Sequence, residues 1–139
     1  MPELALLDEA VLVHYMSGDS GARNLIDQLL GGEVSLAISA ATSLHLWCHE
    51  VSGRKAEIHL SALMRFIEQV PLSGNTAKSS GTIFAREQAS LPNELEDSVT
   101  VDLGTLKAVN AAISLETGMP IYSRNVEWYE NLGCEVLSY

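Results

Sequence analysis

Two polar side chains lie at the ends of two expected strands, where an α/β protein usually builds its functional site, and a third lies on the helix between those strands. Asp8 stops the apolar run at residues 3–7, and Asn125 ends the polar turn after a short apolar run at residues 120–122. Lys107 lies on the helix that leads to the second of these strands, and its neighbours are mostly alanine and aliphatic residues. A lysine in this setting marks either an active site or the place where an active site has been lost.

A second group of reactive side chains consists of His45, Cys48 and His49, at positions i, i+3 and i+4 of an expected helix. This spacing places them on one helix face, where imidazole and thiolate groups can ligate zinc or another transition metal. The alternative is structural. His45 stands among large apolar residues, so it can equally be a hydrogen-bonded, partly buried side chain, with Cys48 as a small core residue.

The elements that must position these side chains follow from the hydrophobic pattern. Short apolar runs predict strands at residues 3–7, 34–39, 120–122 and 135–137. Helical spacing predicts a helical stretch around residues 11–13 and helices at about 20–30, 41–51, 54–69, 75–90, 101–117 and 126–131. The polar stretch 91–98 is expected to be the longest loop. Because short apolar strands alternate with helices, we expect an α/β fold with a parallel sheet covered on both faces.

Composition and charge limit the kind of function. The 139 residues are 47% hydrophobic, which is enough for a substantial core in a single domain spanning residues 1–139. The formal net charge of −10 argues against a broad phosphate-binding surface. A narrow groove for a few nucleotides, or an acidic face that binds a basic protein, remains compatible with this charge.

The sequence also indicates where the protein works. No apolar run approaches the roughly 20 residues of a membrane span, and residues 1–3 lack the basic region of a signal peptide. Cys48 and Cys134 lie far apart without a CxxC pair, which fits a reducing compartment, although counting alone also allows one disulfide. We expect a soluble, cytoplasmic protein that does not bind membranes.

Two long segments of the sequence resemble a known family. They are "LALLDEAVLVHYMSGDSGARNLIDQLLGGEVSLAISAATSLHLW" and, much later, "LKAVNAAISLETGMPIYSRNVEWYENLGCEVLSY". Together they are similar to a PIN domain of the VapC toxin type. The resemblance implies a three-layer α/β/α domain with a short, mostly parallel central sheet. It also implies RNA cleavage with magnesium or manganese held by about four acids, a homodimer, and an antitoxin partner.

The family's acidic positions correspond only in part to acids in this chain. The resemblance places the first acid at Asp8, but the threonine or serine beside it is Glu9 here. The family's glutamate on the third helix falls at His45, and the aspartate before the alanine-rich helix segment falls at Lys107. The last position is Asn125, where many members carry aspartate and others asparagine. Asp8 is therefore the acid that the resemblance retains as a metal ligand.

The sign of the charge at Lys107 matters more than the number of acids. An ammonium about 5 Å from a divalent ion would repel it by about 7 kcal/mol at an effective dielectric constant of about 20. We therefore expect Lys107 to neutralise Asp8 in place of an ion, with no cofactor. If the helix is shifted by a turn from the register assumed here, Lys107 is an ordinary exposed lysine. Asp102 would then be a poor substitute because it lies about 140° around the helix, whereas Asn110 shares the face of Lys107.

Two functional hypotheses follow. In the first, the chain is a degenerate PIN protein without metal-dependent nuclease activity, which acts as a homodimer or through an antitoxin-like protein partner. In the second, it is a divalent-metal endoribonuclease, the toxin of a toxin–antitoxin pair, which uses Asp8 with His45, Asn125 and Glu9 and requires Mg²⁺ or Mn²⁺. RNA is a partner only in the second case.

Overall fold

The computed structural model of the chain describes residues 3–32, 34–87 and 100–139. The strands of these residues are β1 (Glu3–Leu7), β2 (Val34–Ser39), β3 (Ile67–Val70), β4 (Ile121–Tyr122) and β5 (Val136–Leu137). The helices are α1 (Glu9–Ser17), α2 (Ser20–Leu30), α3 (Ala40–His49), α4 (Arg54–Met64), α5 (Gly74–Glu87), α6 (Thr100–Thr117) and α7 (Val126–Asn131). In the described residues each of the first three strands is followed by two helices, and β4 is followed by one helix and then β5.

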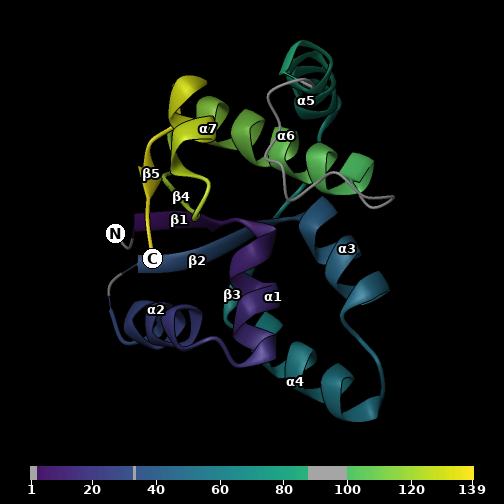
Figure 1. Cartoon of the computed structure of the whole chain (residues 1–139), viewed down its shortest axis with the longest axis vertical. Helices are drawn as coiled ribbons and strands as arrows, with labels where there is room; N and C mark the ends of the chain where they lie inside the picture. Colours follow the sequence, from purple (N-terminus) through teal and green to yellow (C-terminus); the bar gives the residue numbers. More distant parts are fainter. Residues whose placement is uncertain (1–2, 33, 88–99) are drawn as a thin grey trace.

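The described strands form a five-stranded sheet in the order β3-β2-β1-β4-β5. Every pairing is parallel, and β1 is the central strand, between β2 and β4 (Figure 1). The β1–β4 register aligns Leu6 with Ile121 and Leu7 with Tyr122. The carboxyl ends of β1 and β4 therefore lie side by side at one edge of the sheet.

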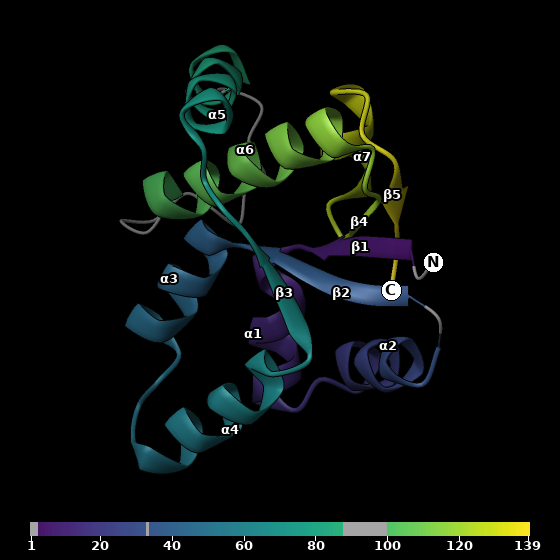
Figure 2. The ribbon, with the colours of Figure 1, turned by 180° about the vertical axis from the view of Figure 1, so that it is seen from behind.

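Helices cover both faces of the sheet. Helices α1, α2 and α4 pack on one face, and α5, α6 and α7 lie on the other (Figures 1 and 2). Successive residues of a strand point to opposite faces. Leu7 thus belongs to the core with α1 and α2, whereas Leu6 belongs to the core with α6 and α7. The predicted three-layer α/β/α fold with a parallel central sheet is confirmed.

One predicted element was wrong. The helix expected at 54–69 ends at Met64, and residues 67–70 form β3 instead. β3 pairs with β2 from Leu36–Ile67 to Ser39–Val70, so contacts with the sheet override the helical pattern of the local sequence. The helix expected at 75–90 is α5 as far as Glu87. Its last residues and the predicted loop 91–98 lie outside the described residues.

The remaining predicted strands and helices are confirmed, with boundaries that differ by a few residues. The ends of two helices show why. Gly18 adopts a left-handed φ of 90° after α1, and the side chain of Asp19 then accepts a hydrogen bond from the Ala22 N–H at the start of α2. Among the described helices, none has the length and apolar character that crossing a membrane requires.

Candidate functional site

The site begins where β1 and β4 end next to each other. Because Leu7 is aligned with Tyr122, the next residues of the two strands, Asp8 and Ser123, are also neighbours. The backbone N–H of Asp8 donates to the carbonyl oxygen of Tyr122 at 3.1 Å. The hydroxyl of Ser123 donates to Asp8 Oδ2 at 2.6 Å. The parallel pairing of two strands thus fixes the position of the Asp8 carboxylate.

Lys107 reaches this carboxylate from α6. Its Nζ atom donates to Asp8 Oδ2 at 2.6 Å and lies 2.7 Å from Glu9 Oε1. The side chains of Lys107, Asp8 and Glu9 are 1%, 0% and 3% exposed, so one ammonium and two carboxyl groups share a space closed to water. The alternative of an exposed Lys107 on a shifted helix register is therefore wrong.

Asn110, one helical turn after Lys107, completes the buried cluster. Its Nδ2 atom donates to Glu9 Oε2 at 3.2 Å, to Asp8 Oδ1 at 3.5 Å and to the hydroxyl of Tyr129 at 3.4 Å. Its Oδ1 atom is buried and has no hydrogen-bond partner in the part of the chain that the structure describes. The amide is held in this orientation because the opposite one would turn its oxygen toward two carboxyl groups.

The electrostatics of the cluster separate its two acids. Burial alone would raise the pKa of Asp8, but the charge of Lys107, together with hydrogen bonds from Glu9, Lys107 and Ser123, lowers it to about 2. Burial raises the pKa of Glu9 well above its ordinary value, and the negative charge of Asp8 raises it further. Asp8 is thus the ionised partner of Lys107, and Glu9 favours its protonated form.

The same environment affects the cationic and phenolic groups. Burial opposes the charge on Lys107, but the negative charges of Asp8 and Glu9 outweigh it and raise the lysine pKa. Burial, followed by those same charges, raises the pKa of Tyr129 well above its usual value. The Lys107 Nζ atom lies 6.0 Å from the centre of the Tyr129 ring, whose face also favours a cation. The surroundings keep Lys107 protonated and Tyr129 neutral.

Asp8 also stands at the N-cap position of α1, which offers a purely structural role for its side chain. Its φ and ψ of −63° and 149° are those of a cap residue, but its side chain makes no capping hydrogen bond. Lys107, Ser123 and Asn110 bind the carboxylate instead. The capping interpretation of Asp8 is therefore excluded.

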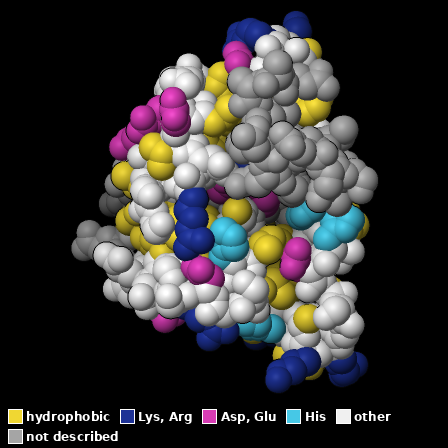
Figure 3. All heavy atoms as spheres, viewed as in Figure 1, with side chains coloured by type: hydrophobic (Ala, Val, Ile, Leu, Met, Phe, Trp, Pro, Cys, Tyr) yellow, Lys and Arg dark blue, Asp and Glu magenta, His cyan; other side chains and the backbone are white. Residues whose placement is uncertain are grey.

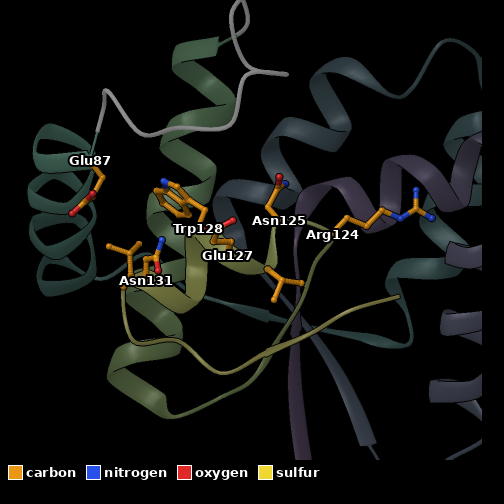
Figure 4. Close-up of a pocket in the computed structure, with 8 residues that line it drawn as sticks. Glu87, Arg124, Asn125, Glu127, Trp128 and Asn131 are labelled. Carbon is orange, nitrogen blue, oxygen red and sulfur yellow. The ribbon is translucent and has the colours of Figure 1, made fainter.

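Asn125 lies next to this cluster but outside its closed interior. Its backbone N–H donates to the hydroxyl of Ser123 at 3.0 Å, which links it indirectly to Asp8. The residue also lines a pocket of about 470 Å³ between the end of α5, the turn after β4 and α7. Figure 4 shows Glu87, Glu127, Trp128 and Asn131 around this pocket, while Arg124 extends away from them.

His45 lines a different pocket. Together with Cys48 and His49 it borders a space of about 280 Å³, whose other wall includes Thr105 and Leu106 of α6. His45 is 9% exposed, and Cys48 and His49 are exposed, so Cys48 is not a core residue as the alternative interpretation had it. In residues 3–32, 34–87 and 100–139, no three His, Cys, Asp or Glu side chains are grouped so that they could hold a metal ion.

A third group of polar contacts lies on the surface beside the cluster. Arg124 pairs with Asp19 at 2.7 Å and lies 4.5 Å above the ring centre of Tyr139. The hydroxyl of Tyr139 is 2.9 Å from Nδ1 of His14. These contacts connect the turn after β4 with α1, the start of α2 and the segment after β5. None of these four residues is among the candidates predicted from the sequence.

Ser123 and Tyr129 are also absent from the candidates predicted from the sequence. Ser123 could have been found, because a polar residue directly after a buried strand, paired in parallel with the strand that ends at Asp8, must lie beside that aspartate. Tyr129 gives no such signal, since a tyrosine in a short helix is usually a core residue. Its contact with Asn110 depends on how α7 packs against α6.

No protein-family model and no curated protein sequence matches the chain. Solved structures match its fold. One is a VapBC2 complex from Rickettsia felis bound to a promoter DNA fragment, with 10% identity, 98% of each chain covered and a TM-score of 0.70. A DNA-bound VapBC from Salmonella typhimurium has 15% identity, covers 99% of this chain and 98% of its own, and has a TM-score of 0.66.

A toxin–antitoxin complex from Klebsiella pneumoniae is also similar, with 17% identity, 88% of each chain covered and a TM-score of 0.64. At such identities the likeness concerns the fold rather than the chemistry of the site. It extends over nearly the whole chain in the two VapBC structures. The VapC-like PIN fold predicted from the sequence is therefore confirmed.

Proposed function

We propose that this chain is a VapC-like PIN-fold protein that acts by binding a protein partner and does not use a divalent ion at the end of β1. The observation that carries the proposal is the Lys107 ammonium, which lies within 2.7 Å of both Asp8 and Glu9. In this proposal the ammonium takes the place of the cation that a metal-dependent PIN nuclease would bind beside Asp8. In this proposal Asp8, Lys107, Asn125 and His45 have no catalytic role.

The donor set does not fit a hard divalent ion. Such ions require several free oxygen ligands. Asp8 Oδ2 already accepts hydrogen bonds from Lys107 and Ser123, and Glu9 Oε1 lies against the same ammonium. An incoming ion would have to displace a buried, protonated lysine and would then leave that charge without a partner, which costs several kcal/mol. The arrangement therefore supports a pocket held together by Lys107 in place of metal.

The comparisons support a protein partner. The similar structures include complexes named as VapBC and toxin–antitoxin assemblies, so this fold occurs in chains that bind another protein. The net charge of −10 favours a partner with a basic contact surface. We propose an antitoxin-like protein as that partner, together with a homodimer of this chain in the cytoplasm.

Cleavage of RNA is the direct test of this proposal. Purified protein would be incubated with a structured RNA and Mg²⁺ or Mn²⁺, beside Asp8→Asn and Asp8→Ala variants whose folding is verified by circular dichroism. We expect no cleavage above a buffer control. Cleavage that EDTA stops and that a folded Asp8 variant lacks would overturn the proposal.

Lys107→Asp tests whether the lysine takes the place of an ion. The variant would bring a third carboxyl group beside Asp8 and Glu9, so we expect Mn²⁺ to bind it measurably in calorimetry and to raise its melting temperature. The wild type should show neither effect. Lys78→Asp, a change at an exposed position on α5, is the matched control. Equal Mn²⁺ binding by the wild type and Lys107→Asp would contradict the role given to Lys107.

The assembly state can be measured separately. Sedimentation at micromolar concentration should give the mass of a dimer, and a monomeric mass would count against the homodimer. Pull-down with a small basic protein encoded by a neighbouring gene would test the partner. Neither experiment depends on the state of the Asp8 pocket.

The second candidate is a divalent-metal endoribonuclease, which the likeness to toxin–antitoxin structures favours. It would use Asp8 with His45, Asn125 and Glu9, and Mg²⁺ or Mn²⁺ as cofactor. This alternative requires Lys107 to leave the carboxylates, and it requires His45, which lines the pocket between α3 and α6, to act with Asp8. The RNA assay described above distinguishes the two candidates.

A further inference from the structure

The face of α3 beside α6 carries nitrogen ligands that the proposed function does not use. His45 and His49 are four residues apart on the helix, and their ring centres are 4.6 Å apart. Both line the pocket of about 280 Å³ between α3 and α6. Histidine side chains gather over α3 on the face of the molecule in Figure 3. We propose that His45 and His49 form a two-imidazole site for a borderline transition-metal ion such as Zn²⁺.

The ring geometry suits such an ion. With zinc–nitrogen bonds of about 2.0–2.1 Å in tetrahedral coordination, the centres of two bound imidazoles lie about 5 Å apart. The observed separation of 4.6 Å is close to this value, and the interplanar angle of 44° is not that of parallel stacked rings. The two rings therefore lie at about the separation that a shared ion requires.

The surroundings also favour a cation at this place. His49 is the last residue of α3, where unsatisfied carbonyl groups give the helix end a partial negative charge. The chain as a whole is acidic, with a net charge of −10. Imidazole binds Zn²⁺, Ni²⁺ and Cu²⁺ and is a poor ligand for Mg²⁺, so this site differs in metal preference from a carboxylate site.

Among the described residues the proposed site has two protein ligands, and in this proposal water takes the remaining coordination positions. Cys48 lies on the same helix face and is exposed, but in the described residues no third histidine, cysteine or acid is grouped with the two imidazoles to hold the ion. Open positions are typical of exchangeable metal sites, whereas structural zinc sites are usually closed by four protein ligands. We therefore assign an exchangeable ion rather than one required for folding.

The test uses reduced protein without a histidine tag, titrated with ZnCl₂ and with CoCl₂ as a spectroscopic probe. We expect one ion per chain and a loss of affinity of at least tenfold in His49→Gln, an exposed position at which the fold should tolerate substitution. His45→Gln should show the same loss. Because His45 is nearly buried, its substitution can disturb the fold. The nitrogen chemical shifts of both imidazoles in the wild-type protein, measured with and without Zn²⁺, test the same ligands without a variant.

Two matched controls make the result specific. His59 lies on α4, and its ring packs against the ring of Tyr15. His59→Gln should therefore leave the Zn²⁺ affinity unchanged. Cys48→Ser should also retain the affinity and the cobalt spectrum, since the proposal assigns no thiolate ligand. Full Zn²⁺ affinity in His49→Gln, or a thiolate-to-cobalt band that disappears in Cys48→Ser, would overturn the two-imidazole site. Either result leaves the proposed protein-binding function untouched.

Discussion

The ammonium of Lys107 lies 2.6 Å from the carboxylate of Asp8, although 99 positions of the sequence separate the two residues. Both side chains are closed to solvent, with exposures of 1% and 0%. A buried ion pair costs desolvation energy on both sides, and removal of one partner leaves the other charge uncompensated. The pair therefore makes the stability of this protein depend strongly on each of its two members.

Lys107→Met should destabilise the protein by about 3–5 kcal/mol, because the Asp8 carboxylate loses its charge partner in a closed space. Urea unfolding at pH 7 measures the change. The matched control is Lys78→Met at an exposed position on α5, for which we expect less than about 0.5 kcal/mol. Similar losses in the two variants would contradict the buried pairing of Lys107.

The double variant Asp8→Asn with Lys107→Met should be more stable than Lys107→Met alone. Removing both charges eliminates the uncompensated carboxylate, and neutral side chains of similar size often replace a buried ion pair at little cost. A double-mutant cycle of unfolding free energies gives the coupling between the positions. Additive effects would show that the two side chains do not interact.

The two acids should respond to substitution by their amides with stability losses of very different size. Asp8→Asn removes the ionised partner of Lys107 and should cost about 3–5 kcal/mol. Glu9→Gln should cost much less, since burial and the charge of Asp8 raise the pKa of Glu9 and favour its neutral form. The unfolding free energies of both variants at pH 7 measure this difference. A larger loss of stability in Glu9→Gln than in Asp8→Asn would reverse the roles assigned to the two acids.

The pH dependence of stability follows from the same assignments. The pKa of Asp8 falls from 3.8 to about 2 on folding, so its stabilisation is present above pH 3.8 and disappears as the pH falls toward 2. Glu9 has the opposite sign: with a pKa raised above 4.5, its contribution is present below pH 4.5 and declines as the pH rises. Urea unfolding from pH 5 to 8 should therefore show a decline in the wild type that is weaker in Glu9→Gln.

Ser123→Ala should destabilise the protein by about 1–3 kcal/mol, because it removes a buried hydrogen bond to a charged group. Ser123 donates to Asp8 at 2.6 Å and accepts from the N–H of Asn125 at 3.0 Å. Ser138→Ala, at an exposed position after β5, is the control and should have almost no effect. Equal effects in the two unfolding curves would argue against a role for Ser123 in holding Asp8.

The sequence predicted most of the elements because their signals are local. The apolar runs that end at Leu7 and at Tyr122 are read from a few neighbouring residues. β3 was missed because its strand character depends on pairing with β2, a contact that the local pattern of residues 54–69 does not contain. The strand conformation of such an edge segment is determined by its pairing with the neighbouring strand.

In the site too, features within one helix could be predicted, and contacts between separate elements could not. The face shared by Lys107 and Asn110 follows from helical geometry and could be predicted. The burial of Glu9 and the role of Tyr129 could not, because they depend on how α6 and α7 pack against the end of β1. The functional assignment of Asp8, His45, Lys107 and Asn125 stays a prediction, and the Asp8 and Lys107 variants described above test two of these residues.

The central position of β1 has a consequence for synthesis on the ribosome. β1 is made first, yet its neighbour β4 and the lysine that binds its terminal aspartate are made about 100 residues later, as the separation of 99 positions shows. At roughly 5–20 residues per second, about 5 to 20 seconds pass between the synthesis of Asp8 and that of Lys107, and during this time the carboxylates of Asp8 and Glu9 have no lysine partner from α6. The nascent chain can pair β1 with β2 early, but the last layer of the fold closes only after translation has passed Tyr122.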